Sequence, residues 1–208
     1  MSKKAGSRKI LSGNRRKFFG GWGTSLTSQT SQTSQTSQTS PPKNHFINIL
    51  VLMKVTLILV GKTTNDIFVR GIADYVERIS HYLPFTITTI PELKNTKKLS
   101  EAQQKEKEGE LILKEIQTAD TVVLLDEHGK EFRSVDYADW LQKKQNTAKR
   151  LVFVIGGAYG FSKAVYDRAN EKISLSKMTF SHQMVRLIFV EQLYRACTII
   201  KGEPYHHE

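Results

Sequence analysis

Cysteine is nearly absent from this chain of 208 residues, in which Cys197 is the only one. One thiol excludes an intramolecular disulfide, and a chain without disulfides fits a reducing compartment such as the cytosol. Cys197 stands in an apolar stretch near the C-terminus. We therefore expect a buried thiol with a structural role rather than a nucleophile.

Long apolar runs are missing as well. A membrane-spanning helix needs roughly 18 to 20 consecutive apolar residues. The nearest approach is the stretch 46–60, which is shorter and is interrupted by Lys54. The sequence therefore predicts no contact with a membrane, and we expect a cytoplasmic protein.

Acidic residues are absent from the first 52 positions, which hold eight lysines and arginines. This segment supplies +8 of the formal net charge of +11, and residues 53–208 contribute only +3. A strongly basic chain favours an anionic partner such as a nucleic acid. Because the remainder of this chain is only mildly basic, RNA binding has to be argued from local sites and not from total charge.

The first 52 residues also lack the composition of a folded core. Residues 1–23 are basic and glycine-rich, and the tripeptide Ser-Gln-Thr repeats from Ser28 onward. We expect a disordered extension over 1–52 and a single domain over 53–208. Three interpretations of the extension stay open: a transit peptide, a basic RNA-binding tail, or translation from an upstream start codon assigned in error.

From Lys54 to the C-terminus, short β-branched runs alternate with helical patterns. Strands are expected at residues 54–60, 85–90, 121–125, 151–155 and 173–176. Helices are expected from Asn65 or Asp66 to about 81, from a capping box at Ser100 to about 117, over 134–145, over 162–168, and from Ser181 onward. Five βα repeats predict an α/β fold, a parallel-rich five-strand sheet with helices on both faces.

Two common phosphate-binding motifs are incomplete. Gly61-Lys62-Thr63 follows the first strand, but a P-loop needs a glycine five positions before the Gly-Lys pair, where Thr56 stands. The run Gly156-Gly157-Ala158-Tyr159-Gly160 after the fourth strand is not the dinucleotide fingerprint. A nucleotide triphosphatase is therefore disfavoured, although the paired glycines supply backbone that a ligand can approach closely.

The ends of three strands are expected to meet at one crevice, because ligands bind beyond the carboxyl ends of parallel strands. These ends lie at Leu125, at Gly156 and in the turn 175–180. Asp126 follows the third strand, and in a turn such a carboxylate more often bonds local backbone than acts in catalysis. The charged residues 105–108 of the second helix are interpreted as a solvated face, with contact between its lysines and RNA as the alternative.

The last helix is apolar on most of its circumference and yet carries Glu191 and Arg195, which lie four residues apart and can pair. An internal ion pair explains them as well as a catalytic role does. This helix belongs to the stretch SLSKMTFSHQMVRLIFVEQLYRA, and the chain ends in PYHHE. Together with IGGAYG at 155–160 and LLDEHGK at 124–130, these motifs resemble the RlmH family over residues 53–208. That resemblance begins at Met53, which favours the mis-assigned start and predicts that residues 1–52 are dispensable.

The RlmH family comprises small bacterial SPOUT-class methyltransferases that act on N3 of a pseudouridine in 23S ribosomal RNA. The resemblance implies an α/β knot, S-adenosylmethionine bound in that knot, and a homodimer working on the large ribosomal subunit. It implies that the cofactor contacts are Leu125, Gly156, Leu175, Ser176, Lys177, Met178, Thr179 and Phe180. It implies that the catalytic residues are Glu191, Arg195, Tyr205 and His206, with His182 and Arg186 in less defined roles.

The resemblance leaves two points open. His206 and His207 have no further ligand at suitable spacing, so no metal site is expected, and the histidine at position 207 departs from the basic residue of some family members. The alternative function is a ribosome-associated RNA-binding protein that keeps the fold but has lost catalysis. We also expect the active site to combine the cofactor of one subunit with Arg195, Tyr205 and His206 of another.

Overall fold

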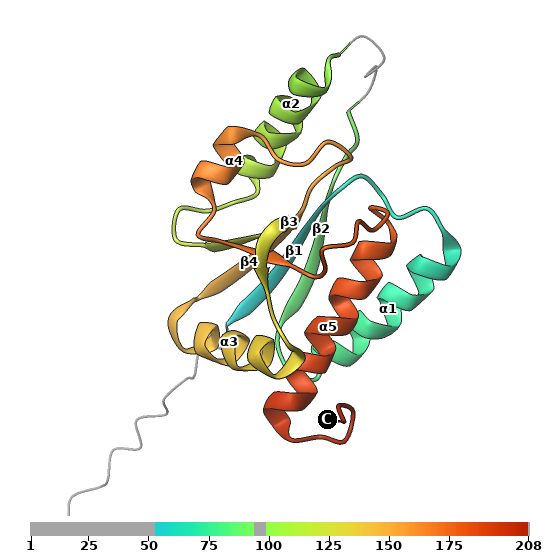
Figure 1. The fold of residues 1–208 in the computed structure, drawn as a ribbon, viewed down its shortest axis with the longest axis vertical. Helices are drawn as coiled ribbons and strands as arrows, with labels where there is room; N and C mark the ends of the chain where they lie inside the picture. Colours follow the sequence, from blue (N-terminus) through green and yellow to red (C-terminus); the bar gives the residue numbers. More distant parts are fainter. Residues whose placement is uncertain (1–52, 94–98, 208) are drawn as a thin grey trace, which may run out of the picture. The chain divides into compact units, whose positions relative to one another are not determined.

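The structure is a computed structural model that describes residues 53–93 and 99–207, so the predicted disorder of residues 1–52 lies outside it. The elements alternate strictly along the chain (Figure 1). They are β1 (Lys54–Val60), α1 (Asp66–Ser80), β2 (Phe85–Ile90), α2 (Glu101–Lys114), β3 (Thr121–Glu131), α3 (Ser134–Thr147), β4 (Arg150–Ile155), α4 (Lys163–Arg168), β5 (Glu171–Ser174) and α5 (Met184–Lys201).

The sheet has five strands in the order β2-β1-β4-β3-β5, and every pair is parallel. In the central strands, Leu57 of β1 faces Ile87 of β2 on one side and Phe153 of β4 on the other. After their first residues, β1 and β4 are buried along their whole lengths. Continuous apolar runs thus form the middle of the sheet, and the predicted α/β class is confirmed. The knot implied by the resemblance stays a prediction.

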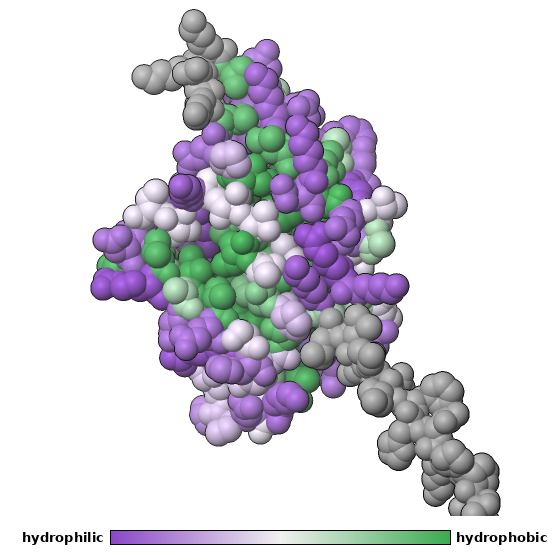
Figure 2. All heavy atoms as spheres, turned by 180° about the vertical axis from the view of Figure 1, so that it is seen from behind, coloured by the Kyte–Doolittle hydropathy of each residue, from purple (hydrophilic) through white to green (hydrophobic). Residues whose placement is uncertain are grey.

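Helices cover both faces of the sheet. The larger core packs side chains of α1, α3 and α5 on one face, and the smaller core packs side chains of α2 and α4 on the other. The crossovers β1–β2 and β3–β4 run toward the β2 edge, whereas β2–β3 and β4–β5 run the opposite way. Connections between parallel strands have the same handedness. Connections that run in opposite directions along the sheet must therefore place their helices on opposite faces. Hydrophobic residues are not all covered, and some gather in the middle of the face shown in Figure 2.

Local hydrogen bonds explain where most helices begin. The side chains of Asn65, Ser100 and Ser162 cap α1, α2 and α4, and Gln103 completes the capping box at Ser100. The predicted starts of these three helices are confirmed.

The apolar stretch at Cys197 is also buried, and burial raises the pKa of the Cys197 thiol to about 12. Among the described helices, none is long and apolar enough to cross a bilayer.

Several predicted boundaries are wrong, and among them α2 ends at Lys114 instead of about residue 117. Strand β3 continues to Glu131 instead of ending at Leu125, since Leu125 and Lys130 both pair with Ile173 around an irregular segment. Strand β5 begins at Glu171 and ends at Ser174, because Trp140 and Lys144 bond the Glu171 carboxylate. Helix α5 begins at Met184, three residues after the predicted cap, although the Ser181 hydroxyl accepts the Met184 N–H at 3.2 Å.

Candidate functional site

A groove of about 720 Å³ opens at the carboxyl end of β4 and beside the middle of β3, where its pairing becomes irregular after Leu125. This size is typical of small-molecule sites. The wall of the groove is built from the middle of β3, the glycine loop after β4, the segment before α5 and the start of α2. The lining residues are Glu101, Lys105, Leu125, Asp126, Glu127, His128, Ile155, Gly156, Gly157, Ala158, Tyr159, Gly160, Phe161, Tyr166, Thr179, Phe180, Ser181, His182 and Val185.

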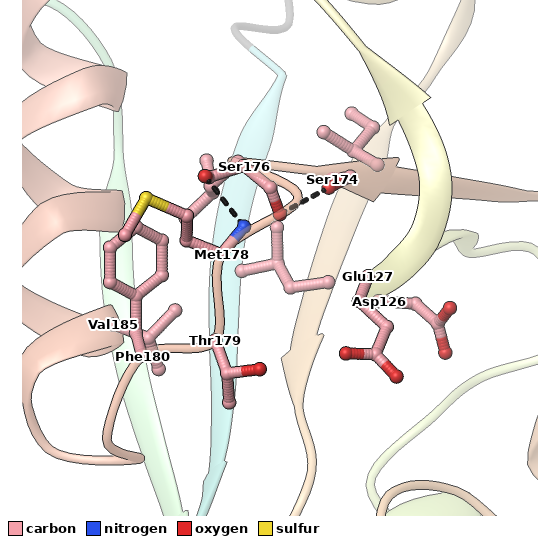
Figure 3. Close-up of a pocket in the computed structure, with 11 residues that line it drawn as sticks. Asp126, Glu127, Ser174, Ser176, Met178, Thr179, Phe180 and Val185 are labelled. Atoms are coloured by element: carbon pink, nitrogen blue, oxygen red, sulfur yellow. Dashed lines mark hydrogen bonds between the residues drawn. The ribbon is translucent and has the colours of Figure 1, made fainter.

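A smaller pocket of about 120 Å³ continues the groove beneath the loop that follows β5. In Figure 3 the loop residue Thr179 lies across from Asp126 and Glu127 of β3. Short-range bonds hold the loop, since the Ser174 hydroxyl donates to the Ser176 carbonyl at 2.9 Å and Ser176 Oγ accepts the Met178 N–H at 2.9 Å. The three predicted strand ends therefore meet in one place.

The two cavities bring together most of the residues predicted to contact a cofactor. Leu125 and Gly156 line the groove, and the loop residues Leu175, Ser176, Met178, Thr179 and Phe180 line the smaller pocket. Lys177 lies apart from them. Its side chain is 86% exposed and reaches 4.0 Å from the carboxylate of Glu131, so it faces solvent on the outside of the loop.

Gly156 and Gly157 are closely packed on the side of the backbone where a side chain would stand. A Cβ on Gly156 would lie 3.0 Å from Cε1 of Phe161, and a Cβ on Gly157 would lie 2.3 Å from Oε2 of Glu108. A side chain at Gly156 would therefore not enter the crevice directly. It would press on Phe161, which is 5% exposed and itself lines the groove.

Asp126 is held by local bonds, as its position after the predicted strand suggested. Its Oδ1 accepts the His128 N–H at 2.9 Å and its Oδ2 accepts the Tyr166 hydroxyl at 2.5 Å. Partial burial and this bond raise the pKa of Tyr166 to about 12, so its hydroxyl stays a neutral donor. Both oxygens of Asp126 are therefore engaged within the protein.

A second cluster lies on α5 and the C-terminal tail. Glu191 Oε1 accepts from Arg195 at 2.5 Å and from the Tyr205 hydroxyl at 3.1 Å. The Arg195 guanidinium lies 4.8 Å from the centre of the Tyr205 ring, a cation–π contact. The predicted pairing of Glu191 with Arg195 is confirmed. The tail is docked on the helix and not frayed, because Tyr205 also packs edge-on against Tyr194 at 4.8 Å.

The chemical state of this cluster follows from its burial. Partial burial, with bonds to Tyr75 and Glu191, raises the pKa of Tyr205 above its usual value. The hydroxyl is therefore a hydrogen-bond donor and not a base at neutral pH. His206 follows, and its Nε2 is buried without a hydrogen-bond partner among the described residues.

The two groups of predicted residues do not meet within one subunit. Val185 lines the groove near the start of α5, and Arg195 lies ten residues further along the same helix. A rise of 1.5 Å per residue separates them by about 15 Å along the axis. In Figure 1 the C-terminus lies at the end of α5 away from the loop that precedes the helix.

His182 and Arg186 have different positions. His182 lines the groove, whereas Arg186 is 1% exposed and donates to Thr63 at 2.9 Å and to the Val60 carbonyl at 2.6 Å. Burial lowers the pKa of this guanidinium, and the nearby Glu92 opposes the shift. Arg186 ties the start of α5 to the end of β1, and Gln183 adds a bond from the Asn65 N–H at 3.1 Å.

Sequence reasoning missed the contribution of α2. Glu101 and Lys105 line the groove, and Glu108 is 5% exposed beneath the glycine loop. The solvated-face interpretation holds for Glu106 and Lys107, which are exposed, but is wrong for Glu108. The signal was Gly109, because a glycine inside a helix costs about 1 kcal/mol and marks close packing. In the described residues, no group of histidine, cysteine and acidic side chains is arranged to hold a metal ion.

The sheet is all-parallel, has helices on both faces and has a groove beyond the carboxyl ends of its strands. These features define a ligand-binding protein of the doubly wound α/β class. Residues 53–206 match the sequence profile of the family described as predicted SPOUT methyltransferase. Proteins named ribosomal RNA large subunit methyltransferase H are similar to this chain. Those of Bacteroides fragilis and Flavobacterium johnsoniae are 65% and 57% identical over 157 residues, which span 75% of this chain and 100% of each relative. The chain belongs to the SPOUT methyltransferase family and, within it, to the group of these RlmH relatives.

Proposed function

We propose that the protein is an S-adenosylmethionine-dependent methyltransferase that methylates N3 of a pseudouridine in 23S ribosomal RNA, with the assembled ribosome as its substrate. The observation that carries the proposal is the groove at the three strand ends, in a chain 65% identical to proteins named for methylation of large-subunit ribosomal RNA. An RNA substrate of this kind places the protein in the cytoplasm.

The residues of the groove fit S-adenosylmethionine. Its volume of about 720 Å³ suits a ligand of that size, and Gly156 and Gly157 leave the backbone open to close approach. The acidic side chains around it complement a positively charged ligand. When bound, the sulfonium makes its methyl group electrophilic, so the protein has mainly to position the reactants.

The second cluster supplies groups suited to the target base. Loss of the N3 proton leaves a negative charge on a uracil-like ring, and the Arg195 guanidinium would favour that anion. Glu191 fixes the direction of this guanidinium through the 2.5 Å bond. Arg195 lies over the Tyr205 ring, so a displaced base would stack on the guanidinium plane or on the ring. His206 Nε2 is a further polar atom without a partner in the described structure.

The separation of groove and cluster supports a homodimer. About 15 Å of helix lies between Val185 and Arg195, so the groove and the cluster are separate parts of one subunit's surface. Helix α5 leaves Met184 exposed and Val185, Ile188 and Ile199 only partly buried, as expected for a helix that packs against a second copy. In this arrangement the cofactor of one subunit faces Arg195, Tyr205 and His206 of its partner.

Deletion of the gene is expected to remove one N3-methylated pseudouridine from the large-subunit ribosomal RNA. Mass spectrometry of the RNA nucleosides measures this loss. Expression of the wild-type chain should restore the methyl group, whereas the Lys201→Gln variant, changed at an exposed residue near the cluster, serves as the matched control and should restore it too. Unchanged methylation in the deletion strain would reject the proposed substrate.

The alternative is an RNA-binding protein of the same fold without catalysis. The two functions differ in their ligand, because only the methyltransferase needs a methyl donor. Calorimetric titration of the purified protein with S-adenosylmethionine separates them. Binding at micromolar affinity supports the enzyme, and its absence, together with binding to ribosomes, supports the alternative.

A chain that begins at Met53 is expected to fold and to methylate as the full chain does. Met53 is 3% exposed and packs in the larger core, and the family match begins at the same residue. The full and shortened chains should therefore have equal melting temperatures and equal methylation rates on ribosomes. A lower melting temperature or a slower rate for the shortened chain would show that residues 1–52 contribute to the protein.

A further inference from the structure

Glu108 of α2 is a buried acidic residue that carries no role in the function proposed above. Its side chain is 5% exposed, and Oε1 accepts a hydrogen bond from Gln104 at 2.8 Å. Its other oxygen, Oε2, is buried and has no partner among the described residues. Leaving a buried carboxylate oxygen unpaired is costly, and such groups gather at functional sites.

The free oxygen lies against the loop that lines the groove. A Cβ built on Gly157 would be 2.3 Å from Glu108 Oε2, so the carboxylate lies directly against the backbone of the loop and would have to move to admit a side chain there. Helix α2 is itself held close, because a Cβ on Gly109 would lie 2.2 Å from the Ser162 hydroxyl oxygen. Two glycines thus bring the acid directly behind the wall of the groove.

The other acids of the groove have both oxygens hydrogen-bonded or are exposed. Both oxygens of Asp126 accept hydrogen bonds from within the protein. The Glu127 side chain is 62% exposed, where water and salt screen its charge, and Glu101 is exposed as well. Among the described acids near the groove, Glu108 is the one that is buried with a carboxylate oxygen left without a partner.

We propose that Glu108 is a positioning residue whose buried charge, acting through the Gly157 loop, makes the groove select a cationic ligand. This inference rests on the proposed function, in which the methyl donor carries a positive sulfonium and the spent product, S-adenosylhomocysteine, a neutral sulfur. The charge raises affinity for the donor relative to the product. It therefore biases the groove toward the reactive form of the cofactor.

Isothermal titration of the full chain with S-adenosylmethionine and with S-adenosylhomocysteine tests the proposal. In Glu108→Gln the affinity for the donor should fall about tenfold relative to the affinity for the product, as expected for opposite charges within about 10 Å at an effective dielectric of about 20. The product lacks the methyl group, and this difference affects the affinity ratio equally in the wild type and in Glu108→Gln. The change in the ratio between the two proteins therefore measures the effect of the charge. A purely structural role would weaken both ligands equally.

Three comparisons complete the experiment. Glu108→Asp keeps the charge and should keep the wild-type ratio within about threefold, even where both affinities fall. Glu110→Gln, an exposed change on the same helix, should leave both affinities unchanged. The melting temperature of Glu108→Gln should equal or exceed that of the wild type, because removal of an unpaired buried charge relieves a cost.

Each result decides the matter. An unchanged ratio in a folded Glu108→Gln protein overturns the charge role, and so does a Glu108→Gln chain that fails to fold, since the acid would then serve the fold. A wild-type protein that binds neither compound would instead reject the proposed function, and this inference with it.

Discussion

Replacement of Gly156 by valine is expected to weaken S-adenosylmethionine binding by more than about a hundredfold. A Cβ alone would lie 3.0 to 3.3 Å from three atoms of the Phe161 ring, tighter than ordinary contacts. The two further methyl groups of valine would force the ring to move. Phe161 is 5% exposed and lines the groove, so its displacement changes the wall that the ligand meets. Calorimetric titration of the purified variant measures the loss.

A graded series makes this result specific. Gly156→Ala adds only the Cβ, which Phe161 can accommodate by a shift of a few tenths of an ångström, so its affinity should fall between the two extremes. Overpacking also lowers stability, by about 1 to 3 kcal/mol. Leu83→Ala, a buried change at the amino end of β2, is the control for stability and should destabilise the protein without altering affinity. Unchanged affinity in Gly156→Val would mean that the cofactor lies elsewhere.

The sheet was predictable because its strands carry unambiguous patterns. Residues 54–60 and 85–90 are short β-branched runs between turn residues, and the structure has both strands with the predicted bounds. Three helix starts were equally clear, since Asn65, Ser100 and Ser162 cap with their own side chains. The fold class and the bounds of these two strands follow from local signals.

Other boundaries depend on partners distant in sequence. Ser181 accepts the Met184 N–H as a cap would, yet helix α5 begins only at Met184. The residue before it, Gln183, bonds the N–H groups of Thr64 and Asn65 at 3.2 and 3.1 Å. Strand β5 begins at Glu171, whose charge suggested a loop until Trp140 and Lys144 supplied its partners. No window of local sequence contains these contacts.

The residues of the candidate site also fall into two groups, those that the sequence revealed and those that depend on contacts distant in the chain. Leu125 and Gly156 follow apolar strands and were found by position, and the loop before α5 was found by the resemblance. Glu108 was missed because a glutamate in a helix of alternating charges normally faces solvent. The neighbouring Gly109 was the one local signal. The closeness of Glu108 to Gly157, 49 positions away along the chain, separates it from the exposed Glu106 and Glu110.

Mixed dimers are expected to regain activity that both of their parents lack. One parent carries Gly156→Val and cannot bind the cofactor. The other carries Arg195→Gln, which removes the cation bonded to Glu191 and stacked on Tyr205. If groove and cluster of different subunits form one site, the mixed dimer holds one intact site and one with both defects. It should therefore show up to about half the wild-type methylation rate per dimer, measured on ribosomes after purification through two different affinity tags.

A second mixed dimer gives the opposite result and decides the arrangement. It pairs the wild-type chain with a chain that carries both Gly156→Val and Arg195→Gln. If each site is shared between subunits, one site pairs the wild-type groove with the Arg195→Gln cluster, and the other pairs the Gly156→Val groove with the wild-type cluster. Both sites are then damaged, so this dimer should be inactive. A site contained in one subunit would leave the wild-type half working, at about half the full rate, and would make the first mixed dimer inactive. The roughly 15 Å of α5 between Val185 and Arg195 leads us to expect activity in the first dimer and none in the second.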